Sequence, residues 1–568
     1  MPRAEARSPA RSREQPAVAA EPVTTVSTRP VETPTGAVPQ QPASGPAQWI
    51  AGRDRWWWLG LAVVAAYAGV VVFTAAHHER WRDEVVPLSI ARGVPSFVDL
   101  WHMVRHEGHP LLWYALLRYA HLLFGTKLVL PGLSLAIAIS AITVFVAFGR
   151  MPLWLKALFV FGYLPIFEYS VVARANGLAM LLLFAFCALG SSVTRRPIAV
   201  GVVLGLLANT SAHAFIIAGA AGAMIVIDAA IAAYRGERPT GRALAGAAVY
   251  ALGLGHAVVS NTPDPTTLSL KLYHHDAAAV LAALGSALLS PVGHSERFLW
   301  VPLASVWVWL AFLLLLCRPG LLAFLFLSLM GFELVFSLLY PASPRHMGYV
   351  VLVVVATVWL WNAGSKYGSS DATRTQADGS SLWLARFQLW GSRLLLLPLV
   401  ALLGWHVALG AGYVVDDVQL QYSSSRRLAE LIASDPALEN AIVIGEPEVS
   451  THALAYYRDN RIYLPQESAF RNWMHFWIPG GRRADYNLAE LLSTATELRD
   501  RWKVPVVMAL GWPLNGSDDQ VVNAGTYFEQ RFYMSAADRT EFLARTQFLG
   551  SLREASFTDE NYDVFVLW

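Results

Sequence analysis

Two neighbouring carboxylates, Asp83 and Glu84, follow closely after the first apolar run of the sequence that is long enough to cross a membrane. Arg80 and Arg82 flank them. A carboxylate in such a place can act as a general base that takes a proton from an attacking hydroxyl or amide. Charged side chains are costly near a bilayer and often mark function there. We therefore take this pair as the first candidate for chemistry, and a solvated helix end with paired charges as the alternative.

One reaction that would need such a carboxylate is glycosyl transfer at a membrane face, where a base takes the proton of the acceptor. When the sugar donor is a lipid phosphate, the phosphate leaves readily, so the reaction needs one base and cations that neutralise the departing group. Asp83 is the candidate base. We expect Glu84 to position the acceptor or a metal ion.

A second polar motif, with Glu107 and His109, leads into an apolar segment about one loop later. Pro110 suits the first turn of a helix, and Trp113 and Tyr114 suit a helix that lies at a membrane interface. We expect Glu107, His109 and Tyr114 to shape the acceptor side of a cavity shared with Asp83. The alternative is a simple cap of an interfacial helix.

Two later turns carry arginines. Glu168 and Arg174 stand between the third and fourth apolar runs, and we expect Glu168 to lie on the acceptor side of the cavity. Arg345 and His346 stand in a tight turn further on. The planar fork of Arg174 can clamp a phosphate, and Arg345 with His346 can neutralise it as it leaves. The alternatives are an ion pair between Glu168 and Arg174 and an Arg345 that snorkels to lipid headgroups.

The segment 261–298 adds further candidates. His274 and His275 in this segment are assigned to the same cavity, and an apolar stretch within it suggests a lid over a lipid donor. The spacing of its histidines and carboxylates matches no standard metal motif, so a divalent cation is an open hypothesis. Glu333 lies inside an apolar run and is a secondary candidate.

The composition indicates a membrane protein with soluble parts. Of the 568 residues, 55% are hydrophobic and only 15% are charged, against about 25% charged in soluble proteins. The net charge of +2 gives no indication of a nucleic-acid partner. Both cysteines fall in apolar runs, so no disulfide framework is expected. Residues 1–55, rich in Pro, Ala, Ser and Thr, are expected to form a disordered cytoplasmic tail.

The apolar runs predict about 11 transmembrane helices, since a crossing needs about 20 residues. The predicted spans are 56–76, 130–149, 152–168, 175–194, 198–212, 213–233, 243–260, 299–317, 320–340, 347–363 and 394–415. Lys and Arg in the short loops place the N-terminus inside and the C-terminus outside only if 111–124 does not cross. We therefore predict an amphipathic surface helix there, in an outer loop 77–130.

Residues 416–568 differ in character from the predicted transmembrane domain 56–415. Short β-prone runs at 441–444, 461–464, 504–510 and 563–567 alternate with predicted helices at 424–434, 451–459 and 487–503. This pattern predicts a small soluble α/β domain on the extracytoplasmic side. The composition and this domain favour a bacterial inner-membrane protein.

The order of these motifs resembles that of the GT-C superfamily of integral-membrane glycosyltransferases. It is most similar to glycosyltransferase family 39, the group of the protein mannosyltransferases and the bacterial lipid A aminoarabinose transferases. The resemblance covers about 56–415. Leu111 and Asn176 depart from the pattern, which bears on the acceptor more than on the fold. The matching residues are Asp83-Glu84, His109-Pro110-Leu111-Leu112-Trp113-Tyr114, Arg174 and Arg345-His346.

The resemblance implies a GT-C fold and a polyprenyl-phosphate-linked sugar donor in the outer leaflet. It also implies inversion at the anomeric carbon and a protein, lipid or glycan acceptor. Two other functions remain open: a flippase or transporter of lipid-linked sugars, and an inactive relative that acts as an assembly partner. A transporter would favour internal repeats and polar residues at mid-membrane, whereas the ionisable residues here gather at one face.

Overall fold

A computed structural model describes the chain from residue 57 onward, with gaps. The described residues are 57–105, 110–190, 195–262, 301–338, 343–364, 379–475, 483, 485–516, 518–523 and 530–568, without the side chains of 301–304 and 379–393. Residues Trp56–Trp568 form one compact unit. The described part is mainly helical, with strands confined to its C-terminal region.

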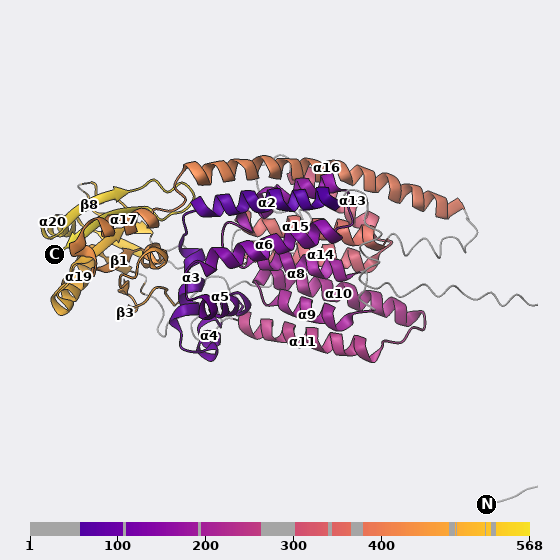
Figure 1. Cartoon of the computed structure of the whole chain (residues 1–568), viewed down its shortest axis with the longest axis horizontal. Helices are drawn as coiled ribbons and strands as arrows, with labels where there is room; N and C mark the ends of the chain where they lie inside the picture. The colour runs from indigo at the N-terminus through magenta and orange to yellow at the C-terminus, as the bar shows by residue number, and fades with distance from the viewer. Residues whose placement is uncertain are drawn as a thin grey trace, which may run out of the picture. The chain divides into compact units, whose positions relative to one another are not determined.

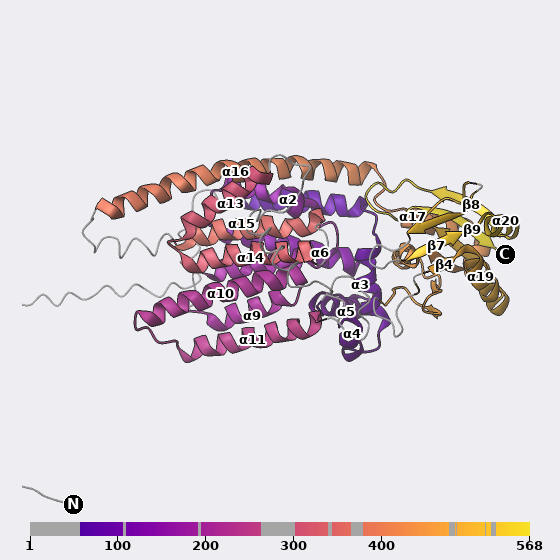
Figure 2. The same cartoon turned by 180° about the vertical axis from the view of Figure 1, so that it is seen from behind.

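Seven helices in the described part are long and apolar enough to cross a membrane, which identifies a multi-pass membrane protein. They are α2 (Trp57–His77), α6 (Val129–Phe148), α10 (Ala212–Tyr234), α11 (Gly241–Asn261), α14 (Pro319–Leu338), α15 (Pro344–Gly364) and, within α16 (Gly379–Gln419), the stretch Leu394–Gln419. Figures 1 and 2 show α2, α6, α8, α10 and α14 running side by side, with α16 along α2.

The other predicted spans contain shorter helices. They are α7 (Leu153–Val160) with the π-helical turn η1 (Leu164–Glu168), α8 (Asn176–Gly190), α9 (Pro197–Ala208) and α13 (Val301–Leu315). Each predicted span therefore contains a helix, but these four are shorter than the roughly 20 residues that a straight crossing needs. The number of 11 crossings stays a prediction.

The segment after the first span forms three short helices that pack together, α3 (Arg82–Gly93), α4 (Phe97–Val104) and α5 (Leu112–Phe124) (Figure 2). The amphipathic helix predicted over 111–124 is α5, which has 13 residues. The contacts of Arg118 in this helix account for the presence of a charged residue in an apolar run. The guanidinium donates hydrogen bonds to the carbonyls of Ala91 and Val94 at 2.8 and 2.6 Å, satisfying groups that the end of α3 leaves open.

The predicted topology can be tested by cysteine labelling in intact cells. We expect a reagent that cannot cross the membrane to label His121→Cys, on α5, and not Thr240→Cys, between α10 and α11. The background should lack both natural cysteines, because Cys317 is exposed. Labelling after permeabilisation is the control for Thr240→Cys. The reverse pattern would overturn the predicted orientation.

The C-terminal region combines helices with three small sheets. Its elements are α17 (Ser425–Ser434), η3 (Pro436–Leu438), β1 (Ile442–Glu446), η4 (Glu448–Thr451), α18 (Leu454–Tyr457), β2 (Tyr463–Leu464), β3 (Ala469–Phe470), β4 (Asp485–Asn487), α19 (Leu488–Trp502), β5 (Val506–Leu510), β6 (Gln520–Asn523), β7 (Arg531–Met534), α20 (Ala536–Arg545), β8 (Gln547–Leu552) and β9 (Tyr562–Leu567). The largest sheet has the order β1-β5-β9-β8, with β1 parallel to β5 and the other pairs antiparallel.

The strands β1, β5 and β9 are buried along their whole length, which explains their unbroken apolar runs. Val443 and Val507 face a core that continues into α17 and the membrane helices. Ile442 and Met508 face the other core, formed with α19 and α20.

Strands occur at the predicted runs 441–444, 504–510 and 563–567, whereas 461–464 contains only the two-residue β2. The predicted helix 451–459 is reduced to α18, and the domain boundary at 416 stays a prediction because α16 runs on to Gln419.

Candidate active site

Asp83, Arg174 and Arg345 come together although they lie far apart in the sequence. Asp83 stands in the first turn of α3, Arg174 in the loop before α8, and Arg345 in the first turn of α15. The Oδ2 atom of Asp83 lies 3.1 Å from Nη1 of Arg174 and 3.4 Å from Nη2 of Arg345. Their side chains keep 18%, 16% and 22% of their surface exposed. The cluster is therefore a carboxylate beside two guanidinium groups, and all three side chains are partly exposed.

Glu84, the neighbour of Asp83, points away from this cluster into the protein. Its side chain is fully buried, with His78 Nε2 at 3.0 Å from Oε1 and Arg80 Nη1 at 2.8 Å from Oε2. The backbone N–H of Ala173 also donates to Oε2 at 2.7 Å. Because Ala173 directly precedes Arg174, Glu84 ties α3 to the loop that carries the first arginine. Glu84 is therefore buried against His78, Arg80 and the Ala173 backbone, and does not face an open site for the acceptor or metal ion that we expected it to position.

The neighbours of Glu84 and His78 shift the pKa values of both side chains. Burial alone would raise the pKa of Glu84, but the charges of His78 and Arg80 outweigh it and lower the pKa to about 2. Burial lowers the pKa of His78, but the carboxylates of Glu84 and Asp417 overcome this and leave the pKa raised. The Nδ1 atom of His78 lies 2.7 Å from Oδ1 of Asp417 near the end of α16. The last span is thereby linked to the segment that carries Asp83.

Arg345 is held in place from two directions. Its backbone carbonyl accepts a hydrogen bond from the Tyr169 hydroxyl at 2.7 Å, and its guanidinium lies over the ring of Trp81 at 5.5 Å. Gly348, one turn further along α15, allows this approach, because a Cβ atom there would overlap the Tyr169 hydroxyl. The loop 169–174 therefore helps to place both arginines.

Two other predicted site residues, His346 and Glu168, lie near this cluster and contact neighbouring side chains of the protein. The ring of His346 stacks on that of His213 at 4.8 Å, and its Nδ1 lies 3.0 Å from the Ser343 hydroxyl. Glu168 is buried and accepts a hydrogen bond from the Tyr163 hydroxyl at 2.7 Å. Their predicted roles at a phosphate and an acceptor stay predictions.

Tyr114, predicted on the acceptor side, is buried among Ile90, Val94 and other apolar residues of α3 and α4. It packs the three short helices together, so the structure does not place it on an open cavity. Four further predicted residues fall outside the described residues: Glu107, His109, His274 and His275.

The described residues contain no group of three or more His, Cys, Asp or Glu side chains that could hold a metal ion. Most of the segment 261–298, on which the hypothesis of a divalent cation partly rested, lies outside those residues. A divalent cation therefore stays a prediction. Glu333 is buried within α14, where the Ser337 hydroxyl donates to it at 3.4 Å.

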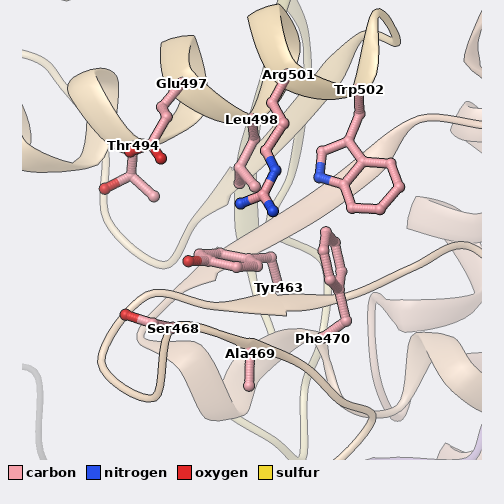
Figure 3. Close-up of a pocket in the computed structure, with 9 residues that line it drawn as sticks. All are labelled: Tyr463, Ser468, Ala469, Phe470, Thr494, Glu497, Leu498, Arg501 and Trp502. Carbon is pink, nitrogen blue, oxygen red and sulfur yellow. The ribbon is translucent and has the colours of Figure 1, made fainter.

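A pocket of about 250 Å³ lies elsewhere, between α19 and the β2–β3 hairpin (Figure 3). Tyr463 and Phe470 face Arg501 and Trp502 across it, and Arg461 stacks on Trp502 at 4.4 Å. The pocket shares no residue with the cluster around Asp83. We therefore place the candidate reaction centre at Asp83, where three residues predicted from the sequence converge.

Sequence reasoning missed the long-range partners of the site. Asp417, which contacts His78, lies 339 residues away from it. The one available signal was a pair of aspartates at the end of the last apolar run, since a charge there needs a polar partner. The alternative of a helix end with paired charges includes Arg80 as a partner of the carboxylates, and in the structure Arg80 contacts Glu84.

No protein-family model matches the sequence, and no curated protein sequence matches it. Two crystal structures of ArnT from Cupriavidus metallidurans are similar to the chain. The one bound to undecaprenyl phosphate has a TM-score of 0.43 and 13% identity, over 90% of this chain and 98% of that chain. The apo structure has a TM-score of 0.40 and 12% identity, over 90% and 97%. Because both TM-scores are below 0.5, the assignments below rest on the chain's own residues.

Proposed function

We propose that the chain is a membrane glycosyltransferase that moves a sugar from a polyprenyl-phosphate-linked donor to an acceptor on the outer face of the membrane, with inversion. The observation that carries this proposal is the contact of Asp83 with both Arg174 and Arg345 just beyond the end of α2. One base and cations that neutralise the departing phosphate are what this reaction needs. The acceptor is a protein, a lipid or a glycan.

In this mechanism, Asp83 takes the proton of the acceptor as its oxygen or nitrogen attacks the anomeric carbon. The bond from that carbon to the phosphate oxygen breaks, and the polyprenyl phosphate gains a negative charge. Arg174 and Arg345 stabilise this charge by charge-assisted hydrogen bonds. A guanidinium carries five N–H donors, more than the carboxylate of Asp83 can accept, so each arginine can serve both the base and the phosphate.

Deletion of the gene tests the activity in the cell. We expect one sugar to disappear from an envelope protein, lipid or polymer, as measured by mass spectrometry of the purified envelope fractions. The wild-type chain should restore it. If deletion removes no sugar from the envelope and no acceptor without its sugar is found, the proposed function is wrong.

The phosphate-binding role predicts a loss of affinity for a lipid phosphate. Arg174→Ala and Arg345→Ala should each weaken binding of undecaprenyl phosphate by about 10- to 100-fold, because a hydrogen bond to a charged group contributes roughly 1.5–3 kcal/mol. Native mass spectrometry of the purified full chain would measure this, with undecaprenol as the uncharged ligand. Arg427→Ala, at a 55% exposed arginine of α17, is the matched control. Equal affinities in all variants would remove the arginines from this role.

A further inference from the structure

Two acidic residues from the C-terminal region reach the first turn of α3. The guanidinium of Arg82 donates to both carboxylate oxygens of Asp559, at 2.5 and 2.9 Å. The backbone N–H of Arg82 donates to Oε1 of Glu560 at 2.8 Å, over a separation of 478 residues. Arg82 directly precedes Asp83. The contact therefore acts on the backbone next to the candidate base.

The start of α3 needs such an acceptor. The first N–H groups of a helix have no partner within the helix, and the residue before the first turn is Trp81, whose side chain has no oxygen that could accept. A carboxylate at this end also interacts favourably with the helix dipole. Within α3, Glu84 accepts a hydrogen bond from the backbone N–H of Trp81 at 3.3 Å. Glu560 supplies the acceptor for the next N–H, that of Arg82.

Glu560 is itself held firmly on the C-terminal side. It is fully buried, and its Oε2 accepts hydrogen bonds from the hydroxyls of Ser423 and Ser425. The Ser425 hydroxyl in turn lies 2.9 Å from that of Tyr562, the first residue of β9. The carboxylate that caps α3 is therefore fixed to the four-stranded sheet.

We propose that Asp559 and Glu560 are positioning residues, which hold the first turn of α3 so that Asp83 faces Arg174 and Arg345. The C-terminal region would then complete the reaction centre from a distance. The inference rests on the proposed function for Asp83. A misplacement of about 1 Å at a reacting group can cost on the order of 100-fold in rate, so a loose first turn should reduce transfer without removing the phosphate site.

Other contacts join the same segment to the C-terminal region. They should preserve the fold when the contacts of Asp559 and Glu560 with Arg82 are lost. The Tyr457 hydroxyl contacts the backbone N–H and carbonyl of Arg80 at 2.5 and 3.2 Å. The backbone N–H of Ser423 donates to Glu79 at 3.3 Å. Loss of Glu560 should therefore loosen the turn that carries Asp83 without separating the two regions.

The test compares Glu560→Ala with Glu560→Gln in the full chain. Glu560→Ala should lower transfer, measured as the envelope sugar restored to a deletion strain, by about 10- to 100-fold. Glu560→Gln keeps an oxygen for the Arg82 N–H and should stay within about threefold of wild type. Both should bind undecaprenyl phosphate with nearly wild-type affinity. Amide hydrogen exchange of residues 81–93 should rise in Glu560→Ala only. Glu554→Ala, at an exposed carboxylate of the same segment, is the control.

Wild-type transfer and unchanged amide exchange in Glu560→Ala would overturn the inference. A loss of transfer that is explained by an equal loss of undecaprenyl phosphate binding would also overturn it. If Glu560→Ala does not fold, Asp559→Ala decides in the same assays, because its side chain is 58% exposed and its loss leaves no buried cavity. If Asp83→Asn retains full transfer, the proposed base is wrong. In that case, the exchange of residues 81–93 alone decides whether Glu560 holds α3.

Discussion

Replacing Asp83 with asparagine should abolish sugar transfer and leave the protein folded in the membrane. Asparagine has nearly the same shape, so it can keep the contacts of the first turn of α3, but its amide cannot take a proton from an acceptor. A positioned general base contributes about 100- to 10,000-fold to a rate. We expect a loss of at least about 100-fold, measured as the envelope sugar that gene deletion removes. The expressed amount in the membrane and the thermal unfolding temperature should stay unchanged.

A matched control for Asp83→Asn is Asp99→Asn. Asp99 is the exposed partner of Ser96 at the start of α4, and asparagine can make similar contacts there. It should retain full transfer. Binding of undecaprenyl phosphate separates the two possible roles of Asp83. If Asp83→Asn loses transfer but binds the lipid phosphate, the residue acts in the chemical step. Full transfer by this variant would remove Asp83 from the role of base.

The largest effect on stability is expected at Glu84. Glu84→Gln leaves the buried guanidinium of Arg80 and the buried ring of His78 without the carboxylate that lies 2.8 and 3.0 Å from them. Breaking a buried ion pair from one side costs roughly 3–5 kcal/mol. We therefore expect a lower thermal unfolding temperature in detergent, together with reduced transfer, because Glu84 also anchors the backbone before Arg174. Glu430→Gln, at a carboxylate of α17 with 57% exposure, should unfold like the wild type.

The pH dependence of stability gives a second measurement on Glu84. Its pKa falls from an ordinary value of 4.5 to about 2 on folding. A lowered pKa means that this group stabilises the folded state above about pH 4.5, and that the contribution is lost as the pH falls from there toward 2. The stability difference between the wild type and Glu84→Gln should therefore shrink over this range. A difference that is independent of pH would show that Glu84 is not ionised in the folded protein.

The sequence alone determined the features that depend on composition and local pattern. Apolar runs predicted the helices of the membrane region, and Pro110 with the apolar face after it predicted α5. Unbroken β-prone runs predicted β1, β5 and β9, because strands buried on both faces need apolar residues at every position. The strand β8 was missed because its side chains are mostly exposed or half-buried. The helix α20 was missed although Ser535 and Asp538 form a capping box, which is a readable signal.

Tertiary structure alone decided the division of labour between Asp83 and Glu84. Successive residues of an α-helix point about 100° apart, so only one of two adjacent carboxylates can face the arginines. The sequence identified the pair but not which member is buried. That choice depends on His78, Arg80 and the Ala173 N–H, which surround Glu84 only when α3 packs against the loop before α8. The link to Asp417 and the cap by Glu560 join residues 339 and 478 positions apart, and only the folded chain brings them together.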